Sequence, residues 1–328
     1  MPVALKTVLI AGGIGLAVLV TLAAFLRTPD IPLAELKRRW APPPSQFLNI
    51  DGIEVHVRDE GSRDDPYPIV LIHGTGSSLQ TWDGWAAGLR STRRVIRFDS
   101  PGFGLTGPNP RGVYTNAYYT DFVVRLLDRL QVKRAVLVGN SAGGRIAWHV
   151  AAAHPERVQA LVLVDAGGYP RSTPLPPGLA VAKSPMGPFL MGFVRRSQVE
   201  TGAKGAYGDP RRLTAETVDR SLAMMRRAGN RSAIGTSLRQ GSDGADAALV
   251  KSVRVPTLIL WGSADTVIPP SDAQRFHRDI PDSQVIILPG VGHMPQEETP
   301  TESLAAAHDL LFGRRDMGRP AGRSNGIP

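Results

Sequence analysis

The stretch LVGNSAGGRIAWHVAAAHP, residues Leu137–Pro155, places a serine between glycines where a strand gives way to a helix. The residues Ala135–Val138 are apolar and partly β-branched, which is typical of a buried strand. The residues Arg145–Ala153 are rich in helix formers. Ser141 therefore occupies the turn between a strand and a helix.

This turn reads Gly139-Asn-Ser-Ala-Gly143 and matches the pattern G-x-S-x-G. In that pattern a sharp turn holds the serine in a strained conformation, with its hydroxyl exposed at the edge of a sheet. A side chain at either outer glycine would collide with the neighbouring strand or helix. A helix N-cap serine is the simpler alternative, but the strand before the turn and the helix after it favour a nucleophile at Ser141.

Short apolar runs recur along the chain and predict a sheet. Two of them flank Asp51-Gly52, a two-residue hairpin signal. The later runs alternate with stretches of helical spacing, which predicts a mainly parallel sheet covered by helices on both faces. The expected strands are Gln46–Ile50, Ile53–Arg58, Ile69–Ile72, Arg94–Phe98, Ala135–Val138, Ala160–Val164, Thr257–Leu260 and Val285–Leu288.

The expected domain organisation follows from where these strands stop. Residues 46–167 and 251–312 form the α/β core. Between them, residues 168–250 have no strand-like run, which predicts a helical cap over the carboxyl edge of the sheet, where open α/β sheets bind ligands. Residues 28–45 read as a linker that ends in a proline-rich spacer, and residues 313–328 read as a disordered tail.

A serine hydroxyl needs a base, and the base needs an acid that fixes its tautomer. His293 follows the last expected strand in a glycine-rich loop, which suits an exposed base. Asp265 follows the strand before it and gives the chain order Ser, Asp, His. Asp165 is the alternative acid, because it ends a neighbouring strand at the same edge of the sheet.

Two backbone N–H groups are candidates for the oxyanion hole, which stabilises the negative charge that develops during acyl transfer. They belong to Thr75, in a glycine turn after a strand, and to Ala142, directly after the proposed nucleophile. His73 is expected to support the loop of Thr75. The chain has no cysteine, and no pair of its seven histidines has convincing metal-ligand spacing, so neither a metal nor a cofactor is expected.

An apolar stretch near the amino terminus predicts a membrane anchor over residues 1–27. Val8–Leu26 contains 19 residues without a charge, and a helix of that length spans about 28 Å, close to the thickness of the hydrocarbon core. A cleaved signal peptide is the competing interpretation, although the run is longer than the apolar core of a usual signal peptide. The expectation is a single-pass membrane protein, with the side of the catalytic domain left open.

The net charge of +9 comes mainly from arginine. The arginines are scattered rather than gathered in a stripe or interleaved with aromatic residues, so nucleic acid is not an expected partner. Attraction to anionic lipid headgroups is compatible with this charge. The oligomeric state stays open.

Six motifs follow one another along the chain: LIHGTG at Leu71–Gly76, RFDSPGFGLTG at Arg97–Gly107, GNSAGG at Gly139–Gly144, LVLVDAGG at Leu161–Gly168, LILWGSAD at Leu258–Asp265 and GVGH at Gly290–His293. Together they resemble the α/β-hydrolase superfamily over about Phe47–Leu311. The resemblance implies a sheet of about eight mostly parallel strands with a helical cap. Relatives that use an aspartate nucleophile, such as haloalkane dehalogenases, carry it at the position of Ser141.

The expected function is hydrolysis of carboxylic esters, hydrophobic ones above all, through an acyl-enzyme on Ser141. With Asn140 beside the serine, this turn resembles the serine turn of the carbon–carbon bond hydrolases of aromatic ring cleavage. Those enzymes are the first alternative. A non-catalytic ligand-binding protein of the same fold is the second, because one fold hosts many functions.

Overall fold

The structure of the protein, a computed structural model, describes residues 25–241 and 244–312. Within these residues, eight strands form one sheet in the order β1-β2-β4-β3-β5-β6-β7-β8. The β1/β2 and β2/β4 pairs are antiparallel and the other five are parallel, which confirms the expected sheet. The strands are β1 (Gln46–Ile50), β2 (Ile53–Glu60), β3 (Ile69–Ile72), β4 (Val95–Phe98), β5 (Ala135–Asn140), β6 (Val158–Val164), β7 (Thr257–Gly262) and β8 (Ser283–Leu288).

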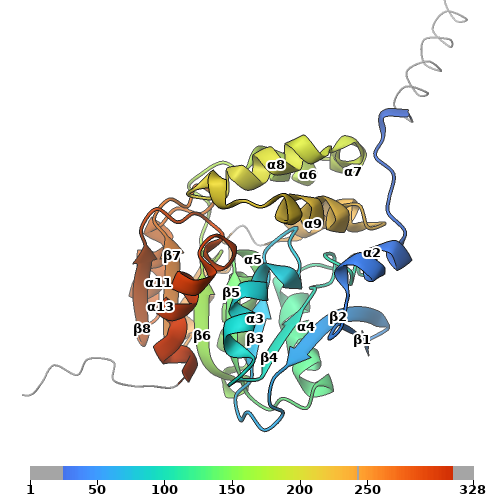
Figure 1. Cartoon of the computed structure of the whole chain (residues 1–328). Coiled ribbons are helices and arrows are strands. Elements are labelled where there is room, and N and C mark those ends of the chain that lie inside the picture. The colour runs from blue at the N-terminus through green and yellow to red at the C-terminus, as the bar shows by residue number, and fades with distance from the viewer. Residues whose placement is uncertain (1–24, 242–243, 313–328) are drawn as a thin grey trace, which may run out of the picture.

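Helices cover both faces of this sheet (Figure 1). Alternate residues of a strand face opposite sides. Leu71 of β3 belongs to the apolar cluster that contains Trp85 of α3, and Ile72 belongs to the cluster that contains Phe122 of α4. The core helices are η1 (Leu79–Trp82), α3 (Asp83–Leu89), α4 (Asn116–Arg129), α5 (Ala142–Ala153), η2 (Pro155–Arg157), α11 (Ser271–Asp279), α12 (Pro295–Glu298) and α13 (Pro300–Phe312).

The described residues between β6 and β7 form helices and loops without a strand. Figure 1 shows the helices that it labels in this region as a layer above the sheet, called the cap below. The Thr214 hydroxyl accepts a hydrogen bond from the N–H of Thr217 and so caps the start of α9. The helices are α6 (Pro177–Lys183), α7 (Gly187–Leu190), η3 (Met191–Phe193), α8 (Arg196–Lys204), η4 (Pro210–Arg212), α9 (Ala215–Met225), α10 (Asn230–Gln240) and η5 (Ala247–Ser252).

Residues 28–45, expected as a linker, contain the helix α2 (Leu33–Trp40). Leu36 and Trp40 are four positions apart, so they lie on one face of α2, and both are buried in an apolar cluster with Met224 of α9. This segment is therefore packed against the cap rather than extended between two parts of the chain.

The expected anchor over residues 1–27 lies outside the described residues, apart from Phe25–Arg27, and so does the expected tail over residues 313–328. Among the described residues, no helix has both the length and the hydropathy that a membrane crossing requires.

Candidate active site

Ser141 lies in a tight turn between β5 and α5, at the carboxyl edge of the sheet. Its φ of 55° and ψ of −117° are unusual for a residue other than glycine, and its N–H donates to the carbonyl of Val164 at 3.0 Å. A Cβ on Gly143 would lie 2.1 Å from the carbonyl oxygen of Ile72, and one on Gly139 would lie 2.3 Å from Gly143. Neither outer glycine can carry a side chain, as the sequence pattern requires.

His293 and Asp265 form a buried pair. The His293 Nδ1–H donates to Oδ2 of Asp265 at 2.7 Å, and the two residues are only 5% and 6% exposed. Burial by itself raises the pKa of Asp265, but the His293 ring and the N–H groups of Val267 and Ile268 outweigh it and hold this pKa below its ordinary value. Asp265 is therefore ionised, and Nε2 of His293 is the ring nitrogen left for proton transfer.

Asn140 joins the serine turn to the histidine loop. Its Nδ2 donates to the backbone carbonyl of His293 at 3.0 Å and to that of Val164 at 3.2 Å. The Ser141 hydroxyl itself makes no hydrogen bond with His293 here, and bonds of this type commonly tighten only around bound substrate. Sequence reasoning gave Asn140 no such role, because its partner is 153 positions away.

Asp165, the alternative acid, lies directly after β6 and is fully buried. Its Oδ1 accepts from the N–H of Gly262 at 3.0 Å, while Oδ2 has no donor among the described residues. Burial, followed by the negative charge of Asp265, raises the pKa of Asp165 well above its ordinary value. The protonated form is therefore favoured at Asp165 and the ionised form at Asp265, and it is Asp265 that accepts from His293.

These three side chains also form the one group within residues 25–241 and 244–312 that could hold a metal ion. One atom each of Asp165, Asp265 and His293 lie within 4.8 Å of one another. The 2.7 Å separation between Nδ1 and Oδ2 is that of a hydrogen bond. A metal at this place would have to displace that bond, so the geometry fits a proton-transfer site better.

The two predicted oxyanion-hole residues flank the serine. Ala142 begins α5, where N–H groups have no partner inside the helix. Thr75 follows Gly74, and a Cβ on Gly74 would lie 3.1 Å from Cβ of Ser141, so this loop passes beside the serine. The N–H groups of Thr75 and Ala142 donate to no described residue. This lack of an acceptor is what a donor to a bound oxygen atom requires.

His73 supports the loop that carries Thr75. Its Nδ1 donates to the Gly74 carbonyl at 2.7 Å, and its Nε2 accepts from the N–H of Ser100 at 3.0 Å. Burial lowers the pKa of His73, so the ring is neutral and can both donate and accept. This arrangement matches the supporting role expected for His73.

Glu298 is a functional candidate that sequence reasoning missed. Its buried Oε2 accepts from the N–H of Gly292, next to the histidine, at 2.8 Å and from the N–H of Gly208, in the cap, at 3.0 Å. The N–H of His293 also donates to the carbonyl of Ala206 in the cap at 2.7 Å. In sequence Glu298 resembles an ordinary acidic residue in a first helical turn, and nothing local indicates these partners.

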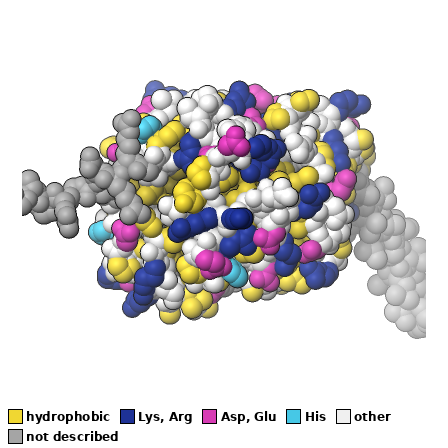
Figure 2. Space-filling view, turned by 90° about the horizontal axis from the view of Figure 1, so that it is seen from below, with side chains coloured by type: hydrophobic (Ala, Val, Ile, Leu, Met, Phe, Trp, Pro, Cys, Tyr) yellow, Lys and Arg dark blue, Asp and Glu magenta, His cyan; other side chains and the backbone are white. Residues whose placement is uncertain are grey.

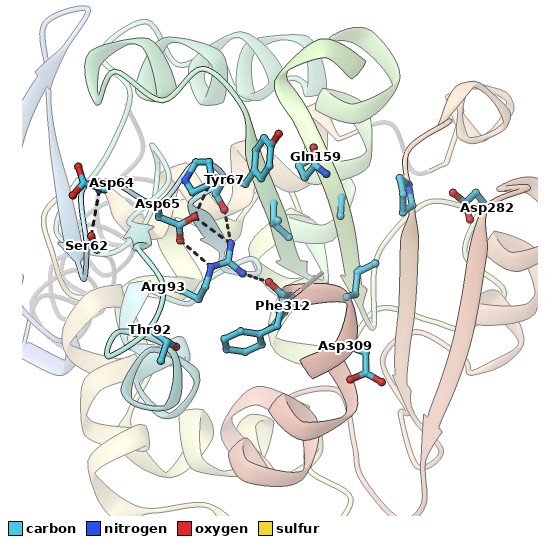
Figure 3. A pocket seen from close by; sticks show the side chains of 16 residues that line it. Ser62, Asp64, Asp65, Tyr67, Thr92, Arg93, Gln159, Asp282, Asp309 and Phe312 are labelled. Atoms are coloured by element: carbon cyan, nitrogen blue, oxygen red, sulfur yellow. Dashed lines mark hydrogen bonds and ion pairs between the residues drawn. The ribbon is translucent and has the colours of Figure 1, made fainter. Parts of the chain in front are cut away.

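A cavity of about 710 Å³ lies at the other end of the strands (Figure 3). There Arg93 donates to Asp65 at 2.9 Å and to the carbonyl of Tyr67 at 2.7 Å, and its guanidinium stands over the ring of Phe312. None of the predicted site residues lines this cavity. The predicted site residues lie instead at the carboxyl edge of the sheet, around Ser141.

Comparison with known proteins agrees with this geometry. Residues 67–300 match the family described as alpha/beta hydrolase fold. An uncharacterized protein of Mycobacterium tuberculosis is 31% identical over 298 residues, which cover 87% of this chain and 84% of the relative. A 2-hydroxy-6-oxononadienedioate/2-hydroxy-6-oxononatrienedioate hydrolase of a Pseudomonas species is 30% identical, over 77% of this chain and 92% of the relative.

Among solved structures, a candidate lipase from Acinetobacter baumannii AYE superposes with a TM-score of 0.72. It is 25% identical and covers 87% of this chain and 97% of its own. The family match extends over most of the described chain, and the sheet order and the serine turn agree with it. This chain belongs to the α/β-hydrolase family.

Proposed function

We propose that the protein hydrolyses carboxylic esters through a serine nucleophile, Ser141, with His293 as general base and Asp265 as its acid partner. The observation that carries the proposal is the buried hydrogen bond between His293 and Asp265 at the edge of the sheet that holds the strained serine turn. This combination supplies both a nucleophile and an oriented base.

In the first half of the reaction, the Ser141 oxygen attacks the acyl carbon while Nε2 of His293 takes the hydroxyl proton. The N–H groups of Thr75 and Ala142 stabilise the oxyanion. His293 then gives the proton to the departing alcohol, which leaves an acyl group on Ser141. In the second half, His293 removes a proton from water and the hydroxide attacks the acyl carbon. His293 then returns that proton to the Ser141 oxygen as its bond to the acyl carbon breaks, which releases the acid and restores the free serine and the neutral imidazole.

Hydrophobic esters are the proposed substrates, and the apolar amino-terminal stretch and the similarity to a candidate lipase support this choice. The test is hydrolysis of p-nitrophenyl esters from acetate to palmitate by the full chain in detergent. We expect kcat/KM to rise about fourfold per methylene group, equivalent to about 0.8 kcal/mol, until the acyl pocket is full. Efficient turnover of acetate with no gain for longer chains would contradict the proposal.

A carbon–carbon bond hydrolase is the second candidate. It is favoured by the relative of 30% identity whose name describes hydrolysis of a ring-cleavage product. A vinylogous diketone assayed beside the ester panel separates the two functions by their kcat/KM values. If neither substrate class is hydrolysed, the binding protein without catalysis becomes the better interpretation.

We also propose that residues 1–27 anchor the protein in a membrane as a single span. The 19 uncharged residues Val8–Leu26 support this proposal. Washing membranes that contain the full chain with alkaline carbonate is expected to leave the protein in the pellet. Release into the supernatant would contradict the anchor and would leave the ester proposal untouched.

A further inference from the structure

Exposed large apolar side chains gather at one corner of the cap. Met186 is 56% exposed and Phe189 is 53% exposed, both in the short helical region α6–α7. Of the nine large apolar side chains exposed among the described residues, six lie in two short segments. These six, called the cap surface below, are Phe25, Leu26, Val181, Met186, Phe189 and Leu190.

The two segments lie together although they are far apart in sequence. The N–H and the hydroxyl of Thr28 both donate to the carbonyl of Gly192 at 2.8 Å, which ties the start of the described chain to η3. Figure 1 shows the amino-terminal segment running beside the cap next to α7. The apolar stretch that ends at Leu26 therefore leads directly to the cap surface.

Basic residues outnumber acidic ones around this corner. Between Asp165 and Glu200 the chain has no acidic residue, whereas it has four basic ones, Arg171, Lys183, Arg195 and Arg196, of which Arg196 pairs with Glu200 and Asp219. Arg27 adds an exposed cation beside Gly192. On the opposite face, at the far end of the sheet from the cap, basic and acidic side chains are interspersed (Figure 2).

We infer that the cap surface rests in the headgroup layer of a membrane that contains acidic lipids. An interfacial surface combines apolar side chains that enter the acyl boundary with cations that contact anionic headgroups. A second copy of the chain would not account for the position of this surface at the end of the apolar stretch. The inference rests on the proposed anchor and is independent of the proposed ester hydrolysis.

The absence of cysteine allows a direct test on the full chain. Single variants Met186→Cys and Leu190→Cys place an environment-sensitive fluorophore on the cap surface. Tyr67→Cys is the matched control, because Tyr67 is also an exposed apolar residue, 38% exposed, but lies at the amino ends of the strands. Each labelled protein is reconstituted in phosphatidylcholine vesicles with and without phosphatidylglycerol, and with lipids that carry a nitroxide near the headgroup.

The expected result is blue-shifted emission and strong nitroxide quenching at Met186→Cys and Leu190→Cys, with neither at Tyr67→Cys. Phosphatidylglycerol should increase the quenching, and added salt should reduce this increase. Equal quenching at all three positions would overturn the inference, as would quenching at none. A blue shift that follows protein concentration without nitroxide quenching would also overturn it, in favour of contact between two copies.

Two further measurements on the same labelled samples separate this inference from the other proposals. Carbonate extraction reports on the anchor, and ester hydrolysis reports on the active site. Protein that stays in the membrane and remains active but is unquenched at Met186→Cys would refute the docked cap surface alone.

Discussion

Replacing Ser141 with alanine is expected to lower kcat/KM for p-nitrophenyl esters by a factor of about 10⁴–10⁶. The variant lacks the atom that attacks the acyl carbon. The turn itself is kept, because alanine has the same Cβ as serine and places no new atom next to Gly139 or Gly143. The loss should therefore appear in kcat, with little change in the unfolding temperature.

The matched control for this variant is Ser221→Ala. The Ser221 hydroxyl donates to the carbonyl of Thr217 within α9, away from the serine turn. We expect Ser221→Ala to keep activity within a factor of about two, because the bond that it removes is a local one within a helix. If Ser141→Ala kept a tenth of the wild-type rate or more, Ser141 would not be the nucleophile.

Asp265→Asn is expected to lower kcat by about 10⁴. The asparagine amide can donate to Nδ1 of His293, which forces the proton onto Nε2, and a protonated Nε2 cannot accept the proton of Ser141. The hydrogen bond of 2.7 Å between Asp265 and His293 makes this the strongest expected effect of an acid substitution in the site.

Asp165→Asn should have little effect on kcat, because it replaces a neutral acid with a neutral amide that can also donate to Asp265. The pair of variants decides between the two carboxyl groups. Loss of activity in Asp165→Asn together with activity in Asp265→Asn would reverse the assignment and make Asp165 the acid partner of His293.

The same Asp165→Asn variant has an expected effect on stability that depends on pH. Burial and the charge of Asp265 raise the pKa of Asp165 in the folded protein, whereas in the unfolded chain it is about 3.9. Between these two pKa values the folded state binds the extra proton, so this group lowers the free energy of unfolding by about 1.4 kcal/mol per unit of rising pH. Asparagine does not titrate, so the Asp165→Asn variant should not show this decrease in the free energy of unfolding.

Urea unfolding of both proteins from pH 4 to pH 8 measures this difference. At pH 4 the two free energies of unfolding should be close. As pH rises, the free energy of unfolding of Asp165→Asn should exceed that of the wild type by a growing amount, until pH reaches the raised pKa of Asp165 in the folded protein. A difference that stays constant over this range would mean that Asp165 is ionised in the folded protein.

The sequence predicted the sheet, and it predicted that the candidate catalytic residues share one edge of it, because both features have local signals. Runs such as Ile69–Ile72 are apolar at every position, and they coincide with the observed strands. Ser141, Asp265 and His293 each follow such a run, so the topology alone brings them to one edge.

The contacts that hold the site together could not be predicted in the same way. Asn140 and Glu298 act on backbone groups that lie 153 and 90 positions away, and no local pattern encodes such a partner. The helix α2 is a different case. Leu36 and Trp40 have the spacing of a helix face. The neighbouring prolines, however, favour an extended spacer, so the sequence predicted a linker here.

The Glu298 carboxylate has a mechanical consequence for substrate selection. Because one oxygen atom holds both the cap at Gly208 and the loop at Gly292, the two segments cannot separate without breaking hydrogen bonds to a buried carboxylate. Displacement of the cap near Gly208 would shift His293 away from its working position. If His293 is the base, as proposed, a bulky acyl chain that forced this end of the cap upward would disable it, and oversized substrates should be rejected in the rate of reaction rather than in binding.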